Sequence, residues 1–285
     1  MSSLRLRCAS GVALFVGWIG RRLGTSGTSL PGKILLRLAP KAISGLSGQI
    51  PHGCIVVTAT NGKTTTCRLA SAALASGGLR PVHNSAGANM AGGIAACLVS
   101  SDSRTEQNAI GLFEVDEFWI PEVCTQVRPR LLLFGNLFRD QLDRYGELDS
   151  ILDRWRACLP DLVDSGTRIL LCADDPAVAS LAEGIKPSSI IWFGIDDAGC
   201  GIGALPHSAD AGNCRSCGAE LVYDEVLLAH LGHWRCADCG LQRPNRDYSL
   251  TEVTLAGATT SRLVLVDRAG TPHSIELALP GVYNA

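Results

Sequence analysis

Short apolar runs alternate with longer helix-prone segments between residues 54 and 194. The apolar runs are rich in Val, Ile, Leu and Phe, whereas the segments between them mix Ala and Leu with polar residues. This alternation is typical of βαβ units, in which helices cover both faces of a mostly parallel sheet. It predicts strands at 54–59, 109–115, 130–136, 167–173 and 188–194, and helices at 64–76, 91–100, 140–159 and 176–184.

The pattern differs at the two ends of the chain. After residue 200 a Gly- and Ala-rich stretch leads into a cysteine-containing insertion at about 210–243, and the segments 249–257, 260–267 and 272–281 are typical of antiparallel strands joined by turns. We assign residues 46–285 to one central α/β domain and residues 1–45 to a helical docking segment. The apolar run "VALFVGWIG" is too short to span a bilayer and favours an amphipathic helix over a signal peptide.

Composition and charge narrow the class of protein. With 46% hydrophobic and 18% charged residues, the 285-residue chain is globular and has enough apolar content for a packed core. Its net charge of −2 gives no electrostatic case for binding nucleic acid or an acidic membrane surface. Eight of its 12 cysteines are scattered singly among apolar segments, which favours buried free thiols and a reducing, cytoplasmic environment.

A phosphate-binding loop is predicted where the first strand meets the first helix. Free backbone N–H groups and the helix dipole make such a junction an anion site. Gly62 allows close approach of a phosphate, Lys63 can reach the β- and γ-phosphates, and the Thr64 hydroxyl can bind Mg²⁺. Val57 stands where the standard motif has its first glycine, so the match is partial; the alternative is a Thr-capped helix with a solvated lysine.

Polar residues follow several predicted strands, at the edge where open α/β sheets bind their ligands. Glu114 is placed to help hold Mg²⁺ near the γ-phosphate, although a strand-end cap remains the alternative. The other strand-end residues are candidates for the same edge or for turns and helix caps: Asn84, Ser85, Asn89, Asp116, Asn136, Asp174 and Asp175.

Four cysteines form two Cys-x-x-Cys knuckles separated by 18 residues: Cys214, Cys217, Cys236 and Cys239. This spacing predicts a tetrahedral Cys₄ zinc site, which would be structural because no ligand position stays open. A redox pair or two disulfides is the alternative. His230 and His233 lie between the knuckles but are not needed as ligands, and the intervening segment lacks the basic character of a nucleic-acid-binding ribbon.

These motifs, in this order, resemble the Mur ligase family from about residue 30 to the end. "TATNGKTTT" is similar to the ATP-binding loop of the family, with Ala59 where glycine is usual. "NLFRDQLDRYGELD" resembles the family's Asn…Asp-His-Leu-Asp segment, with Gln141 in place of histidine, and "LPGVYNA" resembles the junction that leads into its C-terminal domain. The Cys₄ ribbon is similar to that of one branch, the MurT synthetase subunits of lipid II isoglutaminyl synthase.

The resemblance implies an ATP-dependent ligase that works at the inner membrane face. It would phosphorylate the D-glutamate α-carboxylate of the lipid II stem peptide, and ammonia from a glutaminase partner subunit would then give D-isoglutamine. Lys63 and Glu114 would be catalytic, Thr64 and Glu114 would bind Mg²⁺, and Gln141 makes a two-metal site doubtful. The nucleotide would be held by Thr60, Asn61, Gly62, Lys63, Thr64, Thr65, Asn84, Asn89 and, on the adenine side, Asn284.

Two features limit these expectations. About fifty residues precede the phosphate loop, too few for the separate N-terminal domain of other Mur ligases. The sequence ends at Ala285, where the resemblance implies a C-terminal domain, so we expect either a C-terminally truncated fragment or a protein without this lid. We therefore expect ATP binding without efficient ligation from residues 1–285 alone. The alternatives are another Mur-type ligase that adds an amino acid, and a non-catalytic module that binds ATP and zinc.

Overall fold

A computed structural model describes residues 3–22, 29–85, 88–138, 147–201, 212–255 and 260–278. The chain divides into two compact units, each described here by itself. Unit 1 comprises residues 1–59, 63–133 and 157–168, and unit 2 comprises residues 60–62, 134–156 and 169–285. No helix among the described residues is both long enough and apolar enough to span a bilayer.

Unit 1 contains parallel strands in the order β2-β3-β1-β4. Their bounds are β1 (Cys54–Thr58), β2 (Arg80–His83), β3 (Ala109–Glu114) and β4 (Leu131–Phe134), of which the last residue belongs to unit 2. All six residues of β3 are buried, as expected for a central strand covered on both faces. Val57 lies opposite Glu114 and His83 opposite Leu112, so the carboxyl ends of β1, β2 and β3 share one edge.

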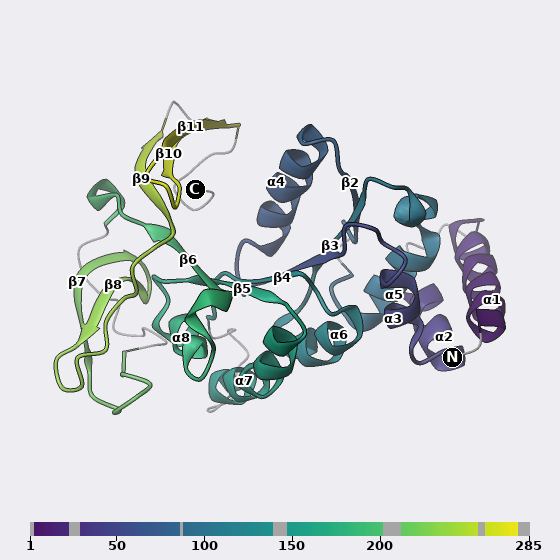
Figure 1. Cartoon of the computed structure of the whole chain (residues 1–285), viewed down its shortest axis with the longest axis horizontal. Helices are drawn as coiled ribbons and strands as arrows, with labels where there is room; N and C mark the ends of the chain where they lie inside the picture. Colours follow the sequence, from purple (N-terminus) through teal and green to yellow (C-terminus); the bar gives the residue numbers. More distant parts are fainter. Residues whose placement is uncertain are drawn as a thin grey trace. The chain divides into compact units, whose positions relative to one another are not determined.

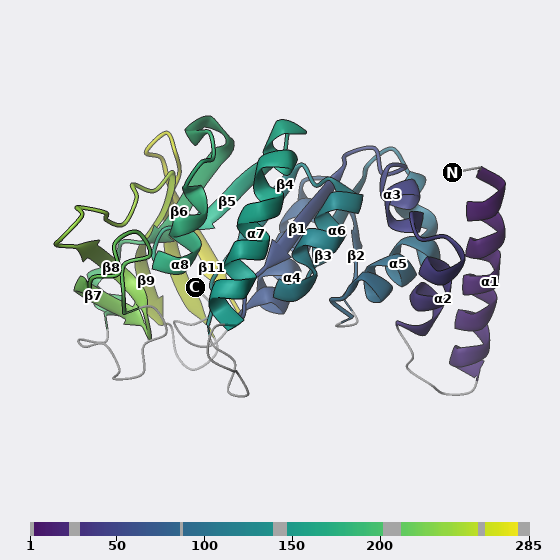
Figure 2. The same ribbon diagram turned by 90° about the horizontal axis from the view of Figure 1, so that it is seen from below.

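Helices of unit 1 cover both faces of these strands. In Figures 1 and 2, α4 lies on one face, whereas α5 and α6 lie on the other, with α3, α2 and α1 stacked farther out. The contact of α2 with α5 is close: a Cβ on Gly32 would lie 1.7 Å from the carbonyl oxygen of Gly92. The helices are α1 (Ser3–Arg22), α2 (Leu30–Leu38), α3 (Ala42–Ser47), α4 (Lys63–Ser76), α5 (Ala91–Ser100) and α6 (Ile120–Val127).

Unit 2 contains a sheet in the order β5-β6-β9-β10-β11, parallel from β5 to β9 and antiparallel from β9 to β11, and a separate hairpin of β7 and β8. Helix α7 (Glu147–Asp164) is divided between the units. The strands are β5 (Arg168–Cys172), β6 (Ile190–Ile195), β7 (Leu221–Leu228), β8 (Leu231–Cys236), β9 (Tyr248–Leu255), β10 (Ser261–Val266) and β11 (Pro272–Leu277), and the remaining α-helix is α8 (Pro176–Ala179).

The structure confirms the mostly parallel α/β fold with a short antiparallel region and a cysteine-containing insertion. The predicted helix at 176–184 is wrong in length, because α8 ends at Ala179 and a 3₁₀ turn follows at Ser180–Ala182. The part of the predicted helix at 140–146 lies outside the described residues, and α7 continues past Pro160 to Asp164. The described residues also contain short 3₁₀ segments: η1 (Asp102–Thr105), η2 (Glu117–Trp119), η3 (Ser180–Ala182), η4 (Pro187–Ser189) and η5 (Ala198–Cys200).

Candidate nucleotide-binding site and cysteine cluster

The predicted phosphate loop joins β1 to α4. Gly62 has a φ of +83°, the left-handed region that a residue with a Cβ rarely adopts. Helix α4 begins at the next residue, Lys63, so the backbone N–H groups of its first turn have no partner within the helix. Thr64 and Thr65 lie on this first turn. The local geometry is thus a turn that opens directly onto a helix N-terminus.

Lys63 is held against its own loop and against a neighbouring acid. Its Nζ donates to the carbonyl oxygen of Ala59 and lies 3.1 Å from Oε2 of Glu117, and both side chains of the ion pair are largely buried. Glu117 was not predicted from the sequence as a site residue. It lies in the short 3₁₀ turn η2 after β3, and only the tertiary structure brings it close to Lys63. An anion that approaches the loop would compete with Glu117 for this ammonium group.

Thr64 and Glu114 are brought together as the sequence predicted. Oγ1 of Thr64 donates to Oε1 of Glu114 at 3.1 Å. Glu114 is buried, and its backbone is fixed by Asn84: the Asn84 amide donates to the Glu114 carbonyl at 2.8 Å and accepts from the Glu114 N–H at 2.9 Å. Hydroxyl and carboxylate oxygens are the ligands that Mg²⁺ prefers, so this pair could hold the ion.

The first residues of the loop belong to unit 2 and are held by the segment after β4. The Thr60 N–H donates to the Asn136 carbonyl, and the Asn61 N–H donates to Oδ1 of Asn136 at 2.9 Å, while the Asn136 amide returns a bond to the Asn61 carbonyl. Thr60 also accepts from the Phe138 N–H through Oγ1. The N–H groups of Thr60 and Asn61 are therefore used to hold the loop, which leaves the first turn of α4 as the source of donors for an anion.

The other predicted polar residues have different positions. Asn89 accepts from the Asp116 N–H through its backbone carbonyl, and the Asp116 carboxylate caps η2 by accepting from Phe118. Asn284 and Gln141 lie outside the described residues. Ser85 and Asn84 line a cavity of about 480 Å³ in unit 1. That volume suits a small ligand, and further walls come from α1, α2 and α5.

A second set of potential metal ligands touches the same edge of unit 1. This set consists of Cys67, His83 and Glu114. Each residue offers one potential ligand atom, and the three atoms all lie within 4.8 Å of one another. Burial, reinforced by the Glu114 carboxylate, raises the pKa of Cys67 to about 12, whereas burial lowers the pKa of His83. His83 is therefore neutral and Cys67 protonated near pH 7, so a metal ion would have to displace the thiol proton to bind there.

The acids after β5 are structural in unit 2. Asp175 caps α8, accepts from the Leu137 N–H and lies 3.3 Å from Nε2 of His230, with which it is fully buried. Asp174 accepts from Nε of Arg243; burial raises its pKa although the guanidinium charge opposes the rise. Both carboxylates are thus engaged in packing the hairpin and the segment after it against β5, as the turn-residue alternative predicted.

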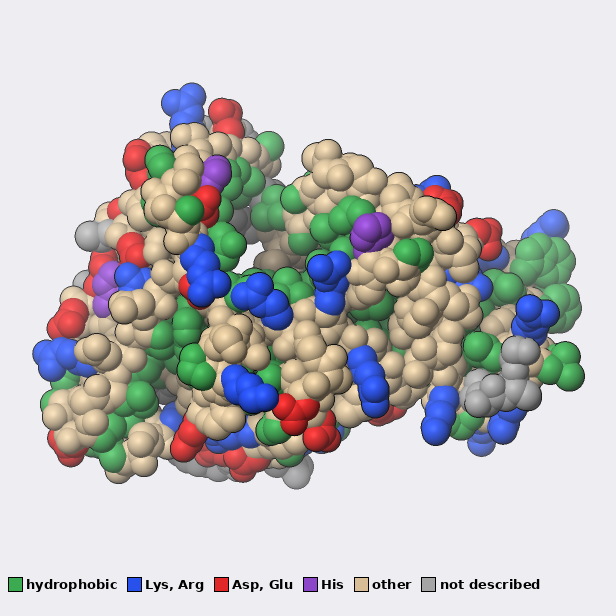
Figure 3. Space-filling view, in the orientation of Figure 1, with side chains coloured by type: hydrophobic (Ala, Val, Ile, Leu, Met, Phe, Trp, Pro, Cys, Tyr) green, Lys and Arg blue, Asp and Glu red, His purple; other side chains and the backbone are tan. Residues whose placement is uncertain are grey.

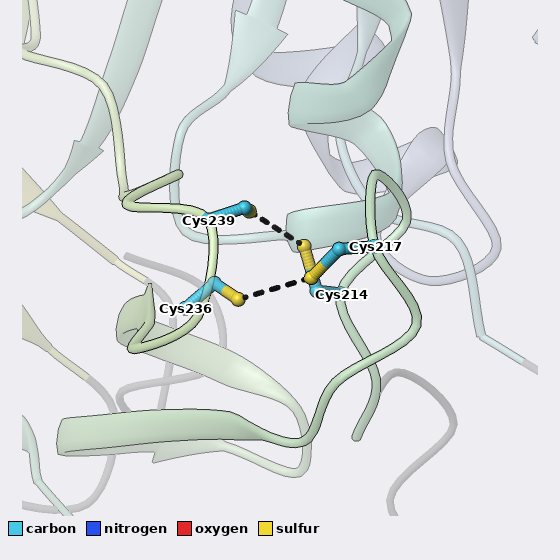
Figure 4. Close-up of side chains that lie close together, drawn as sticks. All are labelled: Cys214, Cys217, Cys236 and Cys239. Atoms are coloured by element: carbon cyan, nitrogen blue, oxygen red, sulfur yellow. Dashed lines mark hydrogen bonds between the residues drawn. The ribbon is translucent and has the colours of Figure 1, made fainter.

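The four clustered cysteines lie close together at the ends of the β7–β8 hairpin (Figure 4). The sulfur–sulfur distances are 3.6 Å for Cys214 and Cys239 and 3.4 Å for Cys217 and Cys236, close to the roughly 3.8 Å expected when Zn–S bonds of about 2.3 Å point to the corners of a tetrahedron. Each knuckle ends in a glycine of positive φ, at positions 218 and 240. The thiols are free, and the donor set and spacing fit zinc.

Gly62 holds the turn of the loop in its left-handed conformation. Replacing it with alanine should weaken the binding of Mg·ATP about tenfold, because the left-handed conformation costs a Cβ-bearing residue roughly 1–2 kcal/mol and the loop would relax away from it. Titration calorimetry measures the effect. The matched control is Gly78→Ala, since Gly78 has a φ of +82° and equally open surroundings after α4. Equal affinities of the two variants would show that the turn at Gly62 has no part in binding.

The sequence of the chain is similar to those of Mur ligases. Residues 57–210 match the family model of the Mur ligase middle domain. The chain is 32% identical over 242 residues to the lipid II isoglutaminyl synthase (glutamine-hydrolyzing) subunit MurT of Staphylococcus aureus strain N315, covering 83% of this chain and 52% of the relative. Identity to the MurT subunit of Streptococcus pneumoniae strain R6 is 33% over 270 residues, covering 93% and 57%. The chain spans about half the length of these relatives.

Solved structures of low sequence identity share the fold. A pseudomurein peptide ligase type C from Methanothermus fervidus superposes with a TM-score of 0.61 at 22% identity, covering 88% of this chain and 49% of that one. MurF from Acinetobacter baumannii gives 0.55 at 15%, covering 91% and 44%. A MurF ligase from Thermotoga maritima in complex with ADP gives 0.51 at 12%, covering 89% and 47%.

Proposed function

Because the chain belongs to the Mur ligase family, we propose that it is the ATP-binding part of a glutamine-dependent ligase. The reaction is amidation of the D-glutamate α-carboxylate in the stem peptide of lipid II. The carboxylate oxygen attacks the γ-phosphorus of ATP, ADP leaves, and an acyl phosphate results. Ammonia then attacks the acyl carbon and phosphate leaves, giving D-isoglutamine.

One observation carries the proposal above the others: similarity to MurT subunits extends over 83% and 93% of the chain. The match to the Mur ligase middle domain, at residues 57–210, contains the loop at residues 60–64. Neither composition nor the loop alone would separate this reaction from that of other ATP-dependent ligases.

The residues of unit 1 can hold the phosphates and magnesium of the nucleotide. The first turn of α4 and Lys63 would bind phosphate oxygens, while Thr64 and Glu114 would bind Mg²⁺, which supplies positive charge to the transferring phosphoryl group. Asn84 is a positioning residue, since it fixes the backbone of Glu114. Without nucleotide, Glu117 would keep the Lys63 ammonium group oriented toward the loop. When a phosphate binds, this ion pair would break and Lys63 would contact the phosphate.

The Cys₄ cluster would hold one structural zinc ion. Four thiolates saturate tetrahedral zinc, so the ion would take no part in the chemistry. Its role would be to fix the β7–β8 hairpin, whose Trp234 is buried and donates from Nε1 to the Ala173 carbonyl at the end of β5. The ribbon would thereby support the strand edge of unit 2.

The proposed partner is a glutaminase subunit that supplies ammonia, and the proposed site of action is the cytoplasmic face of the membrane, where the lipid-linked substrate lies. No nucleic acid takes part. MurT relatives carry the words "glutamine-hydrolyzing" in their names, which supports a nitrogen source of this kind.

An amidation assay tests the proposal. The chain is combined with its glutaminase partner, lipid II, Mg·ATP and glutamine labelled in its amide nitrogen, and the stem peptide is analysed by mass spectrometry. We expect label in the α-carboxamide of D-glutamate, dependent on both ATP and the partner, at a low rate because residues 1–285 span about half the length of the MurT relatives. Free amino acids replace glutamine in a parallel reaction. Incorporation of an amino acid without label would instead identify a Mur-type amino-acid ligase.

A further inference from the structure

Helix α1 carries most of its large apolar side chains outward. The side turned to the rest of unit 1 is made mostly of small residues: Ala9 and Ala13 are buried, and Gly17 lies against Pro31 of α2. Leu6 is the larger residue on this side, next to Gly45 of α3. The large residues lie on the opposite side, where Phe15 is 60% exposed and Trp18 is 48% exposed. The exposed set is Leu4, Val12, Leu14, Phe15, Trp18 and Ile19, which we call the outer face of α1.

The outer face is organised around an aromatic pair. The rings of Phe15 and Trp18 stack with centroids 6.1 Å apart, and the Arg22 guanidinium carbon lies 5.0 Å from the Trp18 ring centroid. Tryptophan and phenylalanine beside arginine form the combination that binds at the boundary between lipid headgroups and acyl chains. Figure 3 shows hydrophobic side chains with Lys and Arg beside them over α1.

Charge adds a second and independent observation. Four arginines lie near the ends of α1: Arg5, Arg7, Arg21 and Arg22. Residues 1–101 contain ten Lys and Arg but no Asp or Glu, whereas the remaining 184 residues contain 15 Lys and Arg and 27 Asp and Glu. The net charge of −2 therefore conceals a strongly basic first third. A surface of this sign attracts anionic lipids, at about fivefold in affinity per arginine near the membrane.

We propose that the outer face of α1 binds the surface of an anionic phospholipid membrane, with Phe15 and Trp18 among the headgroups and acyl chains and the arginines on lipid phosphates. A second copy of the chain is a poorer occupant, since it would bring four arginines against four others. Val16, Gly17, Gly20 and Arg21 of α1 also line the cavity that contains Asn84 and Ser85. Membrane binding would hold this cavity near the membrane surface. That the cavity would then lie near lipid II rests on the proposed function, whereas membrane binding itself does not rest on it.

Vesicle flotation tests this proposal without ATP, lipid II or partner. The chain is mixed with phosphatidylcholine vesicles that contain or lack phosphatidylglycerol. We expect it to float with the anionic vesicles, and we expect Phe15→Ser/Trp18→Ser to lower the partition coefficient at least tenfold. Arg21→Gln/Arg22→Gln should lower it about tenfold or more, and 1 M salt should remove most of the difference between the vesicle types.

Matched variants control for folding and for general loss of apolar surface. Trp18→Phe should bind like the wild type, and so should Leu255→Ser, which removes a side chain of 51% exposure from β9. Failure of the chain to float with anionic vesicles would overturn the proposal, as would unchanged flotation of Phe15→Ser/Trp18→Ser. Self-association that this double variant abolishes, without vesicle binding, would identify a contact between copies instead. A failed amidation assay leaves these outcomes unaffected.

Discussion

Replacement of Lys63 with alanine should reduce the affinity for Mg·ATP by roughly a hundredfold. The ammonium group is the one charged donor placed at the start of α4, and a hydrogen bond to a charged group contributes about 1.5–3 kcal/mol. In the described part of the chain it faces Glu117 at 3.1 Å and the Ala59 carbonyl, so it is already directed toward the loop. Titration calorimetry on the wild type and the variant measures the change.

The control for this prediction is Lys41→Ala, because Lys41 is exposed and precedes α3, at a distance along the chain from the loop. It should bind Mg·ATP like the wild type. Circular dichroism should confirm that Lys63→Ala keeps its helices. Undiminished affinity of a folded Lys63→Ala would mean that the loop is a helix cap with a solvated lysine.

Loss of zinc should unfold the hairpin of unit 2. Replacing Cys217 with serine removes one of four ligands, and we expect less than one tenth of the wild-type zinc content by elemental analysis. The hairpin contributes Leu221, Trp234 and Cys236 to a buried cluster with Ala179 of α8. Exposure of Trp234 should cost about 3 kcal/mol, a decrease of roughly 10 °C in Tm, with a red shift of tryptophan fluorescence.

Cys8→Ser is the matched control, since Cys8 is an exposed single cysteine of α1. This variant should retain one zinc ion per chain and the wild-type Tm. Two outcomes would contradict the zinc assignment. One is a purified chain that contains no zinc and whose Tm does not change when a chelator is added. The other is loss of four free thiols on mild oxidation with Tm preserved, which would favour two disulfides.

The alternation of apolar runs and helix-prone segments predicted most of the parallel sheet because a strand buried on both faces is continuously apolar. β2 lacked this signal: "RPVH" is short, begins with an exposed arginine and contains proline. Helix α6 was also missed, since "IPEVCTQV" is only two turns long. The parallel pairing of β9 with β6 could not be predicted, because it joins segments separated by the whole cysteine insertion.

Residues that act through sequence-local chemistry could be predicted, and residues that act through tertiary contacts could not. The turn at Gly62 and the helix start at Lys63 follow from residue types, and the position of Glu114 follows from the rule for strand ends. By contrast, the contacts of Asn136 with Asn61 join residues 75 apart in the sequence, and Glu117 is 54 residues from Lys63. Net charge, as a single number, concealed the basic first third of the chain.

A crystal structure of the chain with a non-hydrolysable ATP analogue and Mg²⁺ would test the central claim most directly. We predict that the triphosphate lies within hydrogen-bond distance of the first backbone N–H groups of α4, with Nζ of Lys63 moved from Glu117 to the phosphates and Mg²⁺ between Thr64 and Glu114. An empty loop at millimolar nucleotide, or a nucleotide bound elsewhere with Lys63 still paired to Glu117, would contradict it.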